Sequence, residues 1–216
     1  FEGQVFTEWR DDPAAYGTGR FTHVVAPFPI PESWRRFRSF DFGYSRPFSV
    51  GWWALDPHGT LVRYREWYGC TGVPNTGLRL TPTAIARGIA EAERAHEQGL
   101  LVTGYADPSI WDGSRGESIA DQMQREGVYF LPAENARLAG LMQVHRRLEF
   151  DAEGRSGVQV FSTCRDSIRT LPALSYDAQR CEDVDTQGED HIYDEWRYLF
   201  MAHPLPEAPK PAPRRR

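Results

Sequence analysis

A hairpin signal in the first third of the chain constrains the fold more than any other feature. The turn sequence Asp56-Pro57-His58-Gly59 lies between two runs of aromatic and β-branched residues, 47–55 and 60–68. Turn residues between two such runs are typical of antiparallel strands joined by a tight turn. Because a further strand pattern begins at Phe37, we predict a group of antiparallel strands at the start of the domain.

Helical and strand patterns alternate in the rest of the chain. Thr83 is a suitable N-cap and Gly99 a suitable stop for a helix between them. The later patterns predict strands at 100–107 and 128–133, helices at 114–126, 135–148, 164–172 and 189–201, and a second hairpin at 148–161 with its turn at 153–157. Antiparallel strands followed by alternating elements indicate a mixed α/β domain with one central sheet flanked by helices.

The two ends of the chain differ from this regular part. Residues 1–36 contain Pro27, Pro29 and Pro31, which predicts an extended lead-in segment that lies along the surface. Residues 203–216 are rich in proline and arginine, which predicts a flexible tail. We therefore expect one domain over residues 37–202. Because the first residue is Phe1, we also expect the chain to be a fragment of a longer protein.

Composition excludes several classes of protein. Lys210 is the one lysine and no Gly-Lys pair occurs, so the sequence contains no Walker A phosphate-binding loop. Cys70, Cys164 and Cys181 are odd in number and far apart, which argues against a disulfide framework and favours a reducing compartment. The apolar run 50–55 is far shorter than the roughly 18 residues of a membrane span, so we predict no membrane partner.

Acidic residues occur where three predicted elements begin or end. They are Asp41 in the first strand, Asp107 at the end of a later strand, and Asp190 and Asp194 around His191 at the start of the last helix. Strand alternation turns Asp41 away from its two phenylalanine neighbours, and the four-residue spacing places both helix acids on one face. Carboxylates that converge in this way repel each other unless cations neutralise them, and hard oxygen ligands favour Mg²⁺ or Mn²⁺.

Each acidic residue also has a purely structural interpretation. Asp41 could simply end its strand, and Asp107 with Pro108 could form a turn or a helix cap. Asp190 could be a first-turn acid favoured by the helix dipole, with Asp194 a solvated surface residue. The order of the acids along the chain, rather than any one of them, favours a functional site.

Three motifs together resemble a known family. SFDFGY at 39–44, GYADPS at 104–109 and EDHIYDEWRY at 189–198 resemble the nuclease domain of the large terminase subunit of tailed bacteriophages. EGQVFTEW and HVVAPFPIPESW in the lead-in segment resemble the stretch that joins the ATPase motor of that family to its nuclease. The likeness covers about residues 2–202, and Asp-His-x-x-Asp followed by an aromatic helix is its most distinctive motif.

The resemblance implies an RNase H-like (RuvC-like) α/β fold and a two-metal-ion endonuclease. It implies that Asp41, Asp107 and Asp194 bind two Mg²⁺ or Mn²⁺ ions, with Asp41 bridging them. His191 and Asp190 would lie close by as a further ligand or as a group that supports one. The choice between Asp190 and Asp194 as the third ligand stays open.

The function implied by the resemblance is largely sequence-nonspecific cleavage of concatemeric viral DNA during genome packaging, in the cytoplasm of the host bacterium. The implied partners are double-stranded DNA, an ATPase motor domain missing from this chain, the portal protein and the small terminase subunit. One alternative is a RuvC-like resolvase or another RNase H-like nuclease. Another is a noncatalytic module that docks to DNA or to the portal.

Arginines are the candidates for holding DNA. Between Cys181 and Trp196 the chain carries seven acidic residues and no Lys or Arg, so the remainder is mildly basic despite a net charge of −5. Arginine binds phosphate through two parallel hydrogen bonds without reading base sequence. The candidates are Arg155, Arg146, Arg147 and Arg36. Arg155 is the leading one because we expect its hairpin turn to project near the acidic residues, although a solvated surface charge explains each arginine as well.

Overall fold

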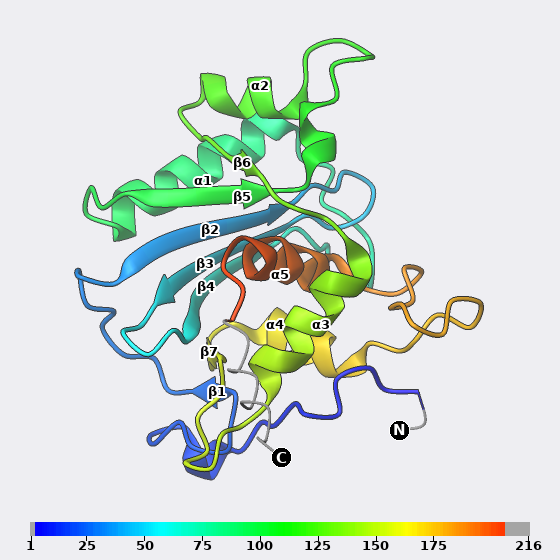
Figure 1. Cartoon of the computed structure of the whole chain (residues 1–216). Helices are drawn as coiled ribbons and strands as arrows, with labels where there is room; N and C mark the ends of the chain where they lie inside the picture. The colour runs from blue at the N-terminus through cyan, green and yellow to red at the C-terminus, as the bar shows by residue number, and fades with distance from the viewer. Residues whose placement is uncertain (1–2, 206–216) are drawn as a thin grey trace, which may run out of the picture.

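The computed structural model describes residues 3–205, which form one sheet with helices on both faces (Figure 1). Seven strands lie in the order β1-β7-β4-β3-β2-β5-β6. The strands are β1 Val24–Val25, β2 Arg35–Asp41, β3 Ser49–Leu55, β4 Leu61–Tyr68, β5 Val102–Ala106, β6 Leu131–Pro132 and β7 Val158–Phe161. β2, β3 and β4 pair antiparallel, and the other neighbours pair parallel. The predicted mixed α/β sheet is confirmed.

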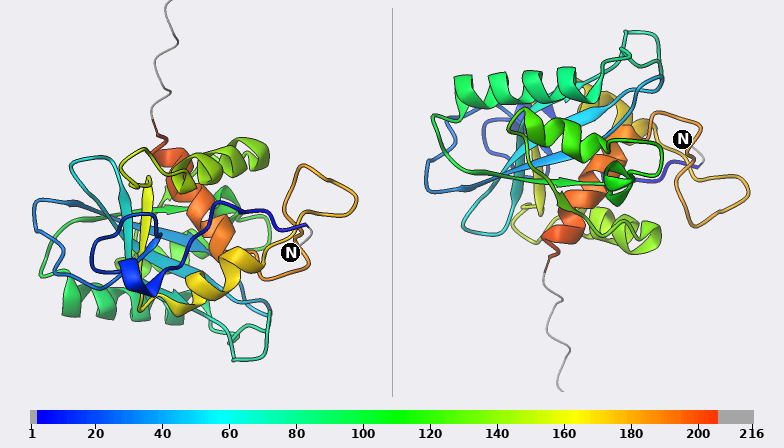
Figure 2. Two further views of the ribbon diagram at one scale, coloured as in Figure 1. Left: turned by 90° about the horizontal axis from the view of Figure 1, so that it is seen from below. Right: turned by 90° about the horizontal axis from the view of Figure 1, so that it is seen from above.

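The helices divide between the two faces of the sheet (Figure 2). They are α1 Pro82–His96, α2 Ile119–Arg125, α3 Arg137–Leu148, α4 Arg165–Thr170 and α5 His191–Ala202, with short 3₁₀ turns η1 Pro13–Ala15, η2 Pro108–Trp111 and η3 Leu171–Ala173. Phe40 and Trp52 pack with α1 and α2 on one face, whereas Phe37 and Trp53 pack with α3 and α5 on the other. None of the helices between residues 3 and 205 has the length and hydropathy needed to cross a membrane.

The first hairpin forms as predicted. Leu55 pairs with Leu61, and the carboxylate of Asp56 accepts hydrogen bonds from the backbone N–H groups of His58 and Thr60, both at 2.8 Å. These bonds close the turn. The aromatic side chains of β3 then point alternately into the two cores, one on each face of the sheet. Trp52 and Trp53 are both buried there.

Two helix starts differ from the predictions. α1 begins slightly earlier than expected, because the hydroxyl of Thr81, not that of Thr83, accepts the cap hydrogen bond from Ala84 N–H and Pro82 occupies the first turn. α2 begins at Ile119 rather than at residue 114, since Ser118 supplies its cap and Gly116 has a positive φ of 125°. Residues 112–117 therefore form a loop.

The second predicted hairpin is wrong beyond its turn. Asp151 and Arg155 close a turn through a 2.8 Å backbone hydrogen bond, but only the single bridge between Phe150 and Ser156 continues it. β7 instead pairs parallel with β4 and β1. The apolar residues of β7 are buried between these strands, and that burial outweighs local hairpin pairing.

The lead-in segment packs into the core, which corrects the expectation that it lies along the surface. Val5, Phe6 and Trp9 are buried in the same core as α5, and Val24 and Val25 form β1 at the edge of the sheet. At the other end, the ring of His203 packs 4.2 Å from that of Phe37, so the predicted tail begins as ordered chain. Residues 206–216 of that tail lie outside the described residues.

Candidate metal centre

Two neighbouring parallel strands bring the first two predicted acids together. β2 pairs parallel with β5, and Phe40 lies opposite Ala106. Asp41 is the last residue of β2, and Asp107 directly follows β5 as the N-cap of η2. Because the carboxyl ends of parallel strands meet at one edge of a sheet, both carboxylates lie at this edge. Asp107 thus caps a helical turn, as its purely structural interpretation predicted, and it also lies at the predicted site.

α5 brings the remaining predicted residues to the same place. This helix packs against β2, β3 and β5 and begins beside Asp41. His191 Nδ1 lies 3.4 Å from Asp41 Oδ2. Asp190, at the N-cap, and Asp194, in the first turn, are close enough to Asp41 for their charges to raise its pKa. Asp41, Asp107, Asp190, His191 and Asp194 are called the acid cluster below.

Tyr198 joins the two strand-end carboxylates. It lies one helical turn after Asp194 and is buried, and its hydroxyl donates a hydrogen bond to Asp41 Oδ1 at 3.4 Å. The same hydroxyl also interacts with Asp107, where it helps to keep the pKa of that carboxyl low. Asn135, which follows β6, donates from Nδ2 to Asp107 Oδ2 at 3.1 Å. The phenol and the amide therefore orient the two carboxylates.

Arginines hold Asp194 in place. Its Oδ1 accepts hydrogen bonds from Arg197 Nε at 3.0 Å and from an Arg197 terminal nitrogen at 2.7 Å. Arg137, at the start of α3, lies 3.7 Å from the same oxygen. Two arginines thus partly neutralise the charge of Asp194. Asp190, in contrast, is buried, and the charge of the nearby Asp194 disfavours its ionisation.

Asn75 fixes the orientation of His191. The Nδ2 group of Asn75 donates to the carbonyl oxygens of Gln187 and Gly188, both at 3.0 Å, so its Oδ1 faces His191 Nε2 at 2.9 Å. An amide oxygen only accepts, so the hydrogen of neutral His191 resides on Nε2. Nδ1 is the nitrogen nearest Asp41. Burial would lower the pKa of His191, but the interaction with the Asp41 carboxylate raises it, which favours the protonated ring with its Nδ1–H toward Asp41; loss of that proton leaves the Nδ1 lone pair facing the acid cluster.

Burial and mutual repulsion perturb the pKa values in the cluster. Burial, together with the charges of Asp194 and Asp190, raises the pKa of Asp41 to about 7 against the opposing hydrogen bond from His191. Burial and the charge of Asp194 raise the pKa of Asp190 to about 6. Burial would also raise the pKa of Asp107, but hydrogen bonds from Ser109, Asn135 and Tyr198 lower it. Negative charge at Asp41 and Asp190 is therefore undercompensated.

The donor set of the acid cluster fits a hard divalent cation. Carboxylate oxygens are the ligands that Mg²⁺ and Mn²⁺ prefer, and a cation would relieve the repulsion that raises the pKa of Asp41. Between residues 3 and 205, however, no three His, Cys, Asp or Glu side chains stand in the arrangement of a finished metal site. Here the carboxylates accept hydrogen bonds from protein groups: Asp41 from Tyr198, Asp107 from Ser109 and Asp194 from Arg197.

A buried ion pair anchors α5 beneath the cluster. Glu195 is fully buried and accepts hydrogen bonds from Ser39, Ser49 at 2.8 Å, and Arg63 at 2.8 Å. Ser39 lies two residues before Asp41 on the same face of β2, and Ser49 is the partner of Asp41 in β3. Glu195 therefore fixes the position of Asp194 and His191 relative to Asp41.

Two of the predicted DNA-binding arginines are buried, which contradicts their predicted role. Arg36 is 7% exposed and donates to the carbonyl oxygens of Ile30 and Pro31. Arg147 is 2% exposed and donates to backbone carbonyls that include Gly157 O at 2.6 Å. A guanidinium whose donors are used inside the protein cannot reach a phosphate on the surface.

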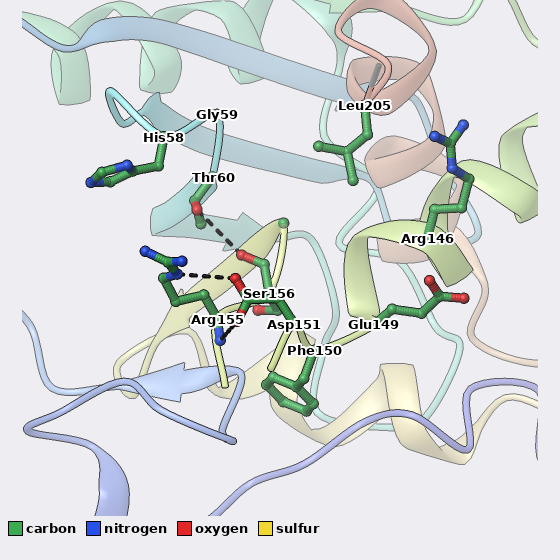
Figure 3. Close-up of a pocket in the computed structure, with 11 residues that line it drawn as sticks. His58, Gly59, Thr60, Arg146, Glu149, Phe150, Asp151, Arg155, Ser156 and Leu205 are labelled. Atoms are coloured by element: carbon green, nitrogen blue, oxygen red, sulfur yellow. Dashed lines mark hydrogen bonds and ion pairs between the residues drawn. The ribbon is translucent and has the colours of Figure 1, made fainter. Parts of the chain in front are cut away.

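Arg155 lies at the end of the sheet opposite the acid cluster, so the expectation that its turn projects near the acids is wrong. It lines a pocket of about 450 Å³ with His58 and Arg146, beside the β3–β4 turn (Figure 3). Arg35, at the start of β2, pairs with Leu55 at that turn, whereas Asp41 is at the other end of β2. Arg155 is also neutralised by Asp151 at 3.0 Å and Glu153 at 3.2 Å. DNA binding by Arg146 stays a prediction.

The sequence motifs do not include the residues that support the cluster. Tyr198 is detectable in retrospect, because it lies four residues after Asp194 on the same helical face. Asn135 has a weaker signal as a polar residue shortly after a predicted strand. Asn75 and Glu195 carry no signal in the sequence, since their roles depend on contacts between distant segments.

Comparison with families of known sequence finds no family model that matches the chain, and no curated protein matches it. Solved structures do match. The chain is similar to the large terminase of a thermophilic bacteriophage, with 19% identity, a TM-score of 0.71, and coverage of 93% of this chain and 45% of that one. The chain therefore spans less than half the length of that protein.

Two isolated nuclease domains match over nearly their whole length. The nuclease domain of the P22 large terminase has 17% identity, a TM-score of 0.64, and coverage of 93% of this chain and 92% of that one. The large terminase nuclease of the thermophilic phage G20c, determined with bound cobalt, has 11% identity, a TM-score of 0.59 and coverage of 93% and 97%. The resemblance implied by the sequence motifs is confirmed at the level of structure. This chain has the RNase H-like fold of the phage large terminase nuclease domains.

Proposed function

We propose that this chain is the nuclease domain of a large terminase subunit, a metal-dependent and largely sequence-nonspecific endonuclease that cleaves concatemeric viral DNA during genome packaging. The observation that carries the proposal is the position of Asp41 and Asp107 at the ends of adjacent parallel strands, with the Asp190–Asp194 turn of α5 packed against them. The fold supports it, since nuclease domains of phage terminases share it.

Asp41, Asp107 and Asp194 would hold two Mg²⁺ or Mn²⁺ ions, with Asp190 and His191 as neighbouring ligands or supports. The cobalt in the G20c nuclease supports a divalent metal. When bound, such ions lower the pKa of water and neutralise charge on a phosphodiester. The protein's own contribution is orientation: Tyr198 and Asn135 position the strand-end carboxylates, Arg197 positions Asp194, and Asn75 keeps Nδ1 of His191 toward Asp41.

The proposed partners follow from the same assignment. Double-stranded DNA is the substrate, and the motor is an ATPase domain in the longer protein. The portal protein and the small terminase subunit complete the packaging machine, and the site of action is the cytoplasm of the infected bacterium.

The direct test is cleavage of supercoiled plasmid by the purified chain with MnCl₂. We expect nicked and linear products, and none when EDTA replaces the metal. Intact plasmid after incubation with Mn²⁺ would show that the chain is a noncatalytic module. Strong preference for a four-way junction over plasmid would instead identify a resolvase.

Metal binding should stabilise the fold, and more so at alkaline pH. Because the folded-state pKa values of Asp41 and Asp190 lie above the unfolded value, ionising these groups destabilises the metal-free protein as pH rises from about 4 to 7. A bound cation offsets this cost, whereas protons compete with it at low pH. At about 100 times the Kd, Mn²⁺ contributes about 2.7 kcal/mol, or roughly 5–10 °C in Tm.

Thermal unfolding followed with and without Mn²⁺ at about pH 8 and about pH 5 measures this difference. The rise in Tm should be clearly larger at the higher pH. An equal rise at both pH values would show that Mn²⁺ binds somewhere other than these carboxylates.

A further inference from the structure

Two loops at the acid-cluster end of the sheet form one unit. The first joins β2 to β3 over residues 42–48, and the second joins β4 to α1 over residues 69–81. Gly77 N–H donates to Ser45 O at 2.9 Å, and Arg79 N–H donates to Tyr44 O at 3.2 Å. A Cβ at Gly77 would clash with backbone carbonyl oxygens of the first loop, so the loops are in direct backbone contact. These two loops are called the two-loop platform below.

The platform is fixed relative to the acid cluster. Asn75, in its second loop, donates to Gln187 O and Gly188 O just before α5 and contacts His191 at its start. The backbone N–H of Asn75 also hydrogen-bonds to the carboxylate of Glu189. In addition, the first loop begins directly after Asp41. A ligand held on this platform would therefore lie at a defined position with respect to Asp41.

Arg46 and Arg79 make the platform cationic. Both are exposed, one from each loop. Arg46 donates to Asn75 O at 3.4 Å, and among residues 3–205 neither guanidinium has an acidic partner. Arg155, Arg169 and Arg180, in contrast, each pair with acids of their own segment or a neighbouring one. Uncompensated positive charge thus lies next to the carboxylates that repel anions.

The backbone at Arg79 is strained. Its φ of 57° lies in the left-handed region, where glycine is favoured and an L-residue with a Cβ loses stability. The side chain forms no hydrogen bond or ion pair with the described residues that would offset this cost. A long cationic side chain at a position that suits glycine points to a ligand outside the protein.

We propose that Arg46 and Arg79 bind backbone phosphates of duplex DNA and hold one strand over the acid cluster. The proposal rests on the proposed nuclease function and replaces the expected role of Arg155. Guanidinium groups bind phosphate through paired hydrogen bonds and do not read bases, which suits cleavage without sequence preference. The platform supplies the attraction that the acid cluster by itself lacks.

The test is binding of a fluorescein-labelled duplex of mixed sequence, followed by anisotropy in CaCl₂ over a range of NaCl concentrations. A gel of each sample shows whether the duplex stays intact. We expect Arg46→Ala and Arg79→Gly each to weaken binding about tenfold. The double variant should reduce the slope of log K against log [NaCl] by about 2, because two phosphate contacts are lost. The Tm of Arg79→Gly should be no lower than that of the wild type, since glycine relieves the strain.

Arg94→Ala is the matched control. Arg94 is exposed on α1 and has no acidic partner in the described part of the chain, and its neighbour Glu97 lies 4.0 Å from Arg36 at the opposite end of β2. Its removal should leave both affinity and slope unchanged. Plasmid cleavage by the wild type is scored separately. If the wild type cuts plasmid but the double variant binds duplex as tightly as the wild type does, the role of the platform is refuted and the nuclease function stands. If the wild type does not bind duplex at all, the role of the platform is refuted as well.

Discussion

Asp41→Asn is expected to reduce Mn²⁺-dependent plasmid cleavage by about 10³-fold or more, corresponding to roughly 4 kcal/mol of transition-state stabilisation. Asp41 lies at the centre of the acid cluster, within reach of His191 and Tyr198, and its charge interacts with both helix acids. Asparagine keeps the size and one acceptor oxygen but removes the negative charge that would hold a cation. Initial rates of nicking at saturating Mn²⁺ measure the loss.

Asp56→Asn provides the matched control for this substitution. Asp56 closes the β3–β4 turn at the other end of the sheet, and asparagine retains the oxygen that accepts from His58 and Thr60. Its cleavage rate should equal that of the wild type. The Tm of metal-free Asp41→Asn should not fall at about pH 8, because the substitution removes a carboxylate whose ionisation is unfavourable there. Wild-type cleavage by a folded Asp41→Asn protein would refute the proposed site.

Glu195→Ala should destabilise the fold by about 3–5 kcal/mol, a large part of the roughly 5–15 kcal/mol that holds a typical domain together. Burial alone would lower the pKa of Arg63, but the carboxylates of Glu195 and Glu66 raise it, so Arg63 stays charged in the core. Removing Glu195 leaves that charge with Glu66 as its remaining partner and deprives Ser39, Ser49 and the Trp53 indole of an acceptor. Urea unfolding measures the change.

Two further variants separate the buried pair from general effects of charge. Glu195→Gln keeps the acceptor oxygen for the serines and should lose less stability than Glu195→Ala. Glu126→Ala removes the partner of Arg87 in a pair that water surrounds, and it should leave the free energy of unfolding nearly unchanged. Equal losses for Glu195→Ala and Glu126→Ala would contradict the anchoring role of Glu195.

Local sequence patterns predicted where the helices and strands lie better than they predicted which strands pair with each other. The β3–β4 hairpin and the direction of Asp41 follow from turn residues and strand alternation, which involve neighbouring residues only. The placement of Asp41 and Asp107 at the same edge of the sheet requires β2 to pair with β5, which lies far along the chain, and no local pattern specifies that pairing. In β7 the local pattern predicted the wrong partner: it indicated a hairpin, but the strand pairs parallel with β4.

Charged residues in strands and helices were the hardest to assign. Periodicity predicts which face of an element a side chain occupies but not how deeply that face is buried. Arg36 and Arg147 look like surface cations in the sequence, yet carbonyl oxygens from distant segments satisfy their donors inside the protein. Glu195 likewise looks like one more acid of an acidic segment, although Arg63 and two serines enclose it.

The packing of the lead-in segment determines where the minimal folding unit begins. Phe6 and Trp9 contact the rings of Tyr193 and Trp196 on α5, the helix that carries His191 and Asp194. A polypeptide shortened to start at the first long strand would lose these aromatic contacts and leave β7 with an unpaired edge. The lead-in segment from Val5 onward is therefore part of the autonomous folding unit, not an appendage that can be trimmed without loss of stability.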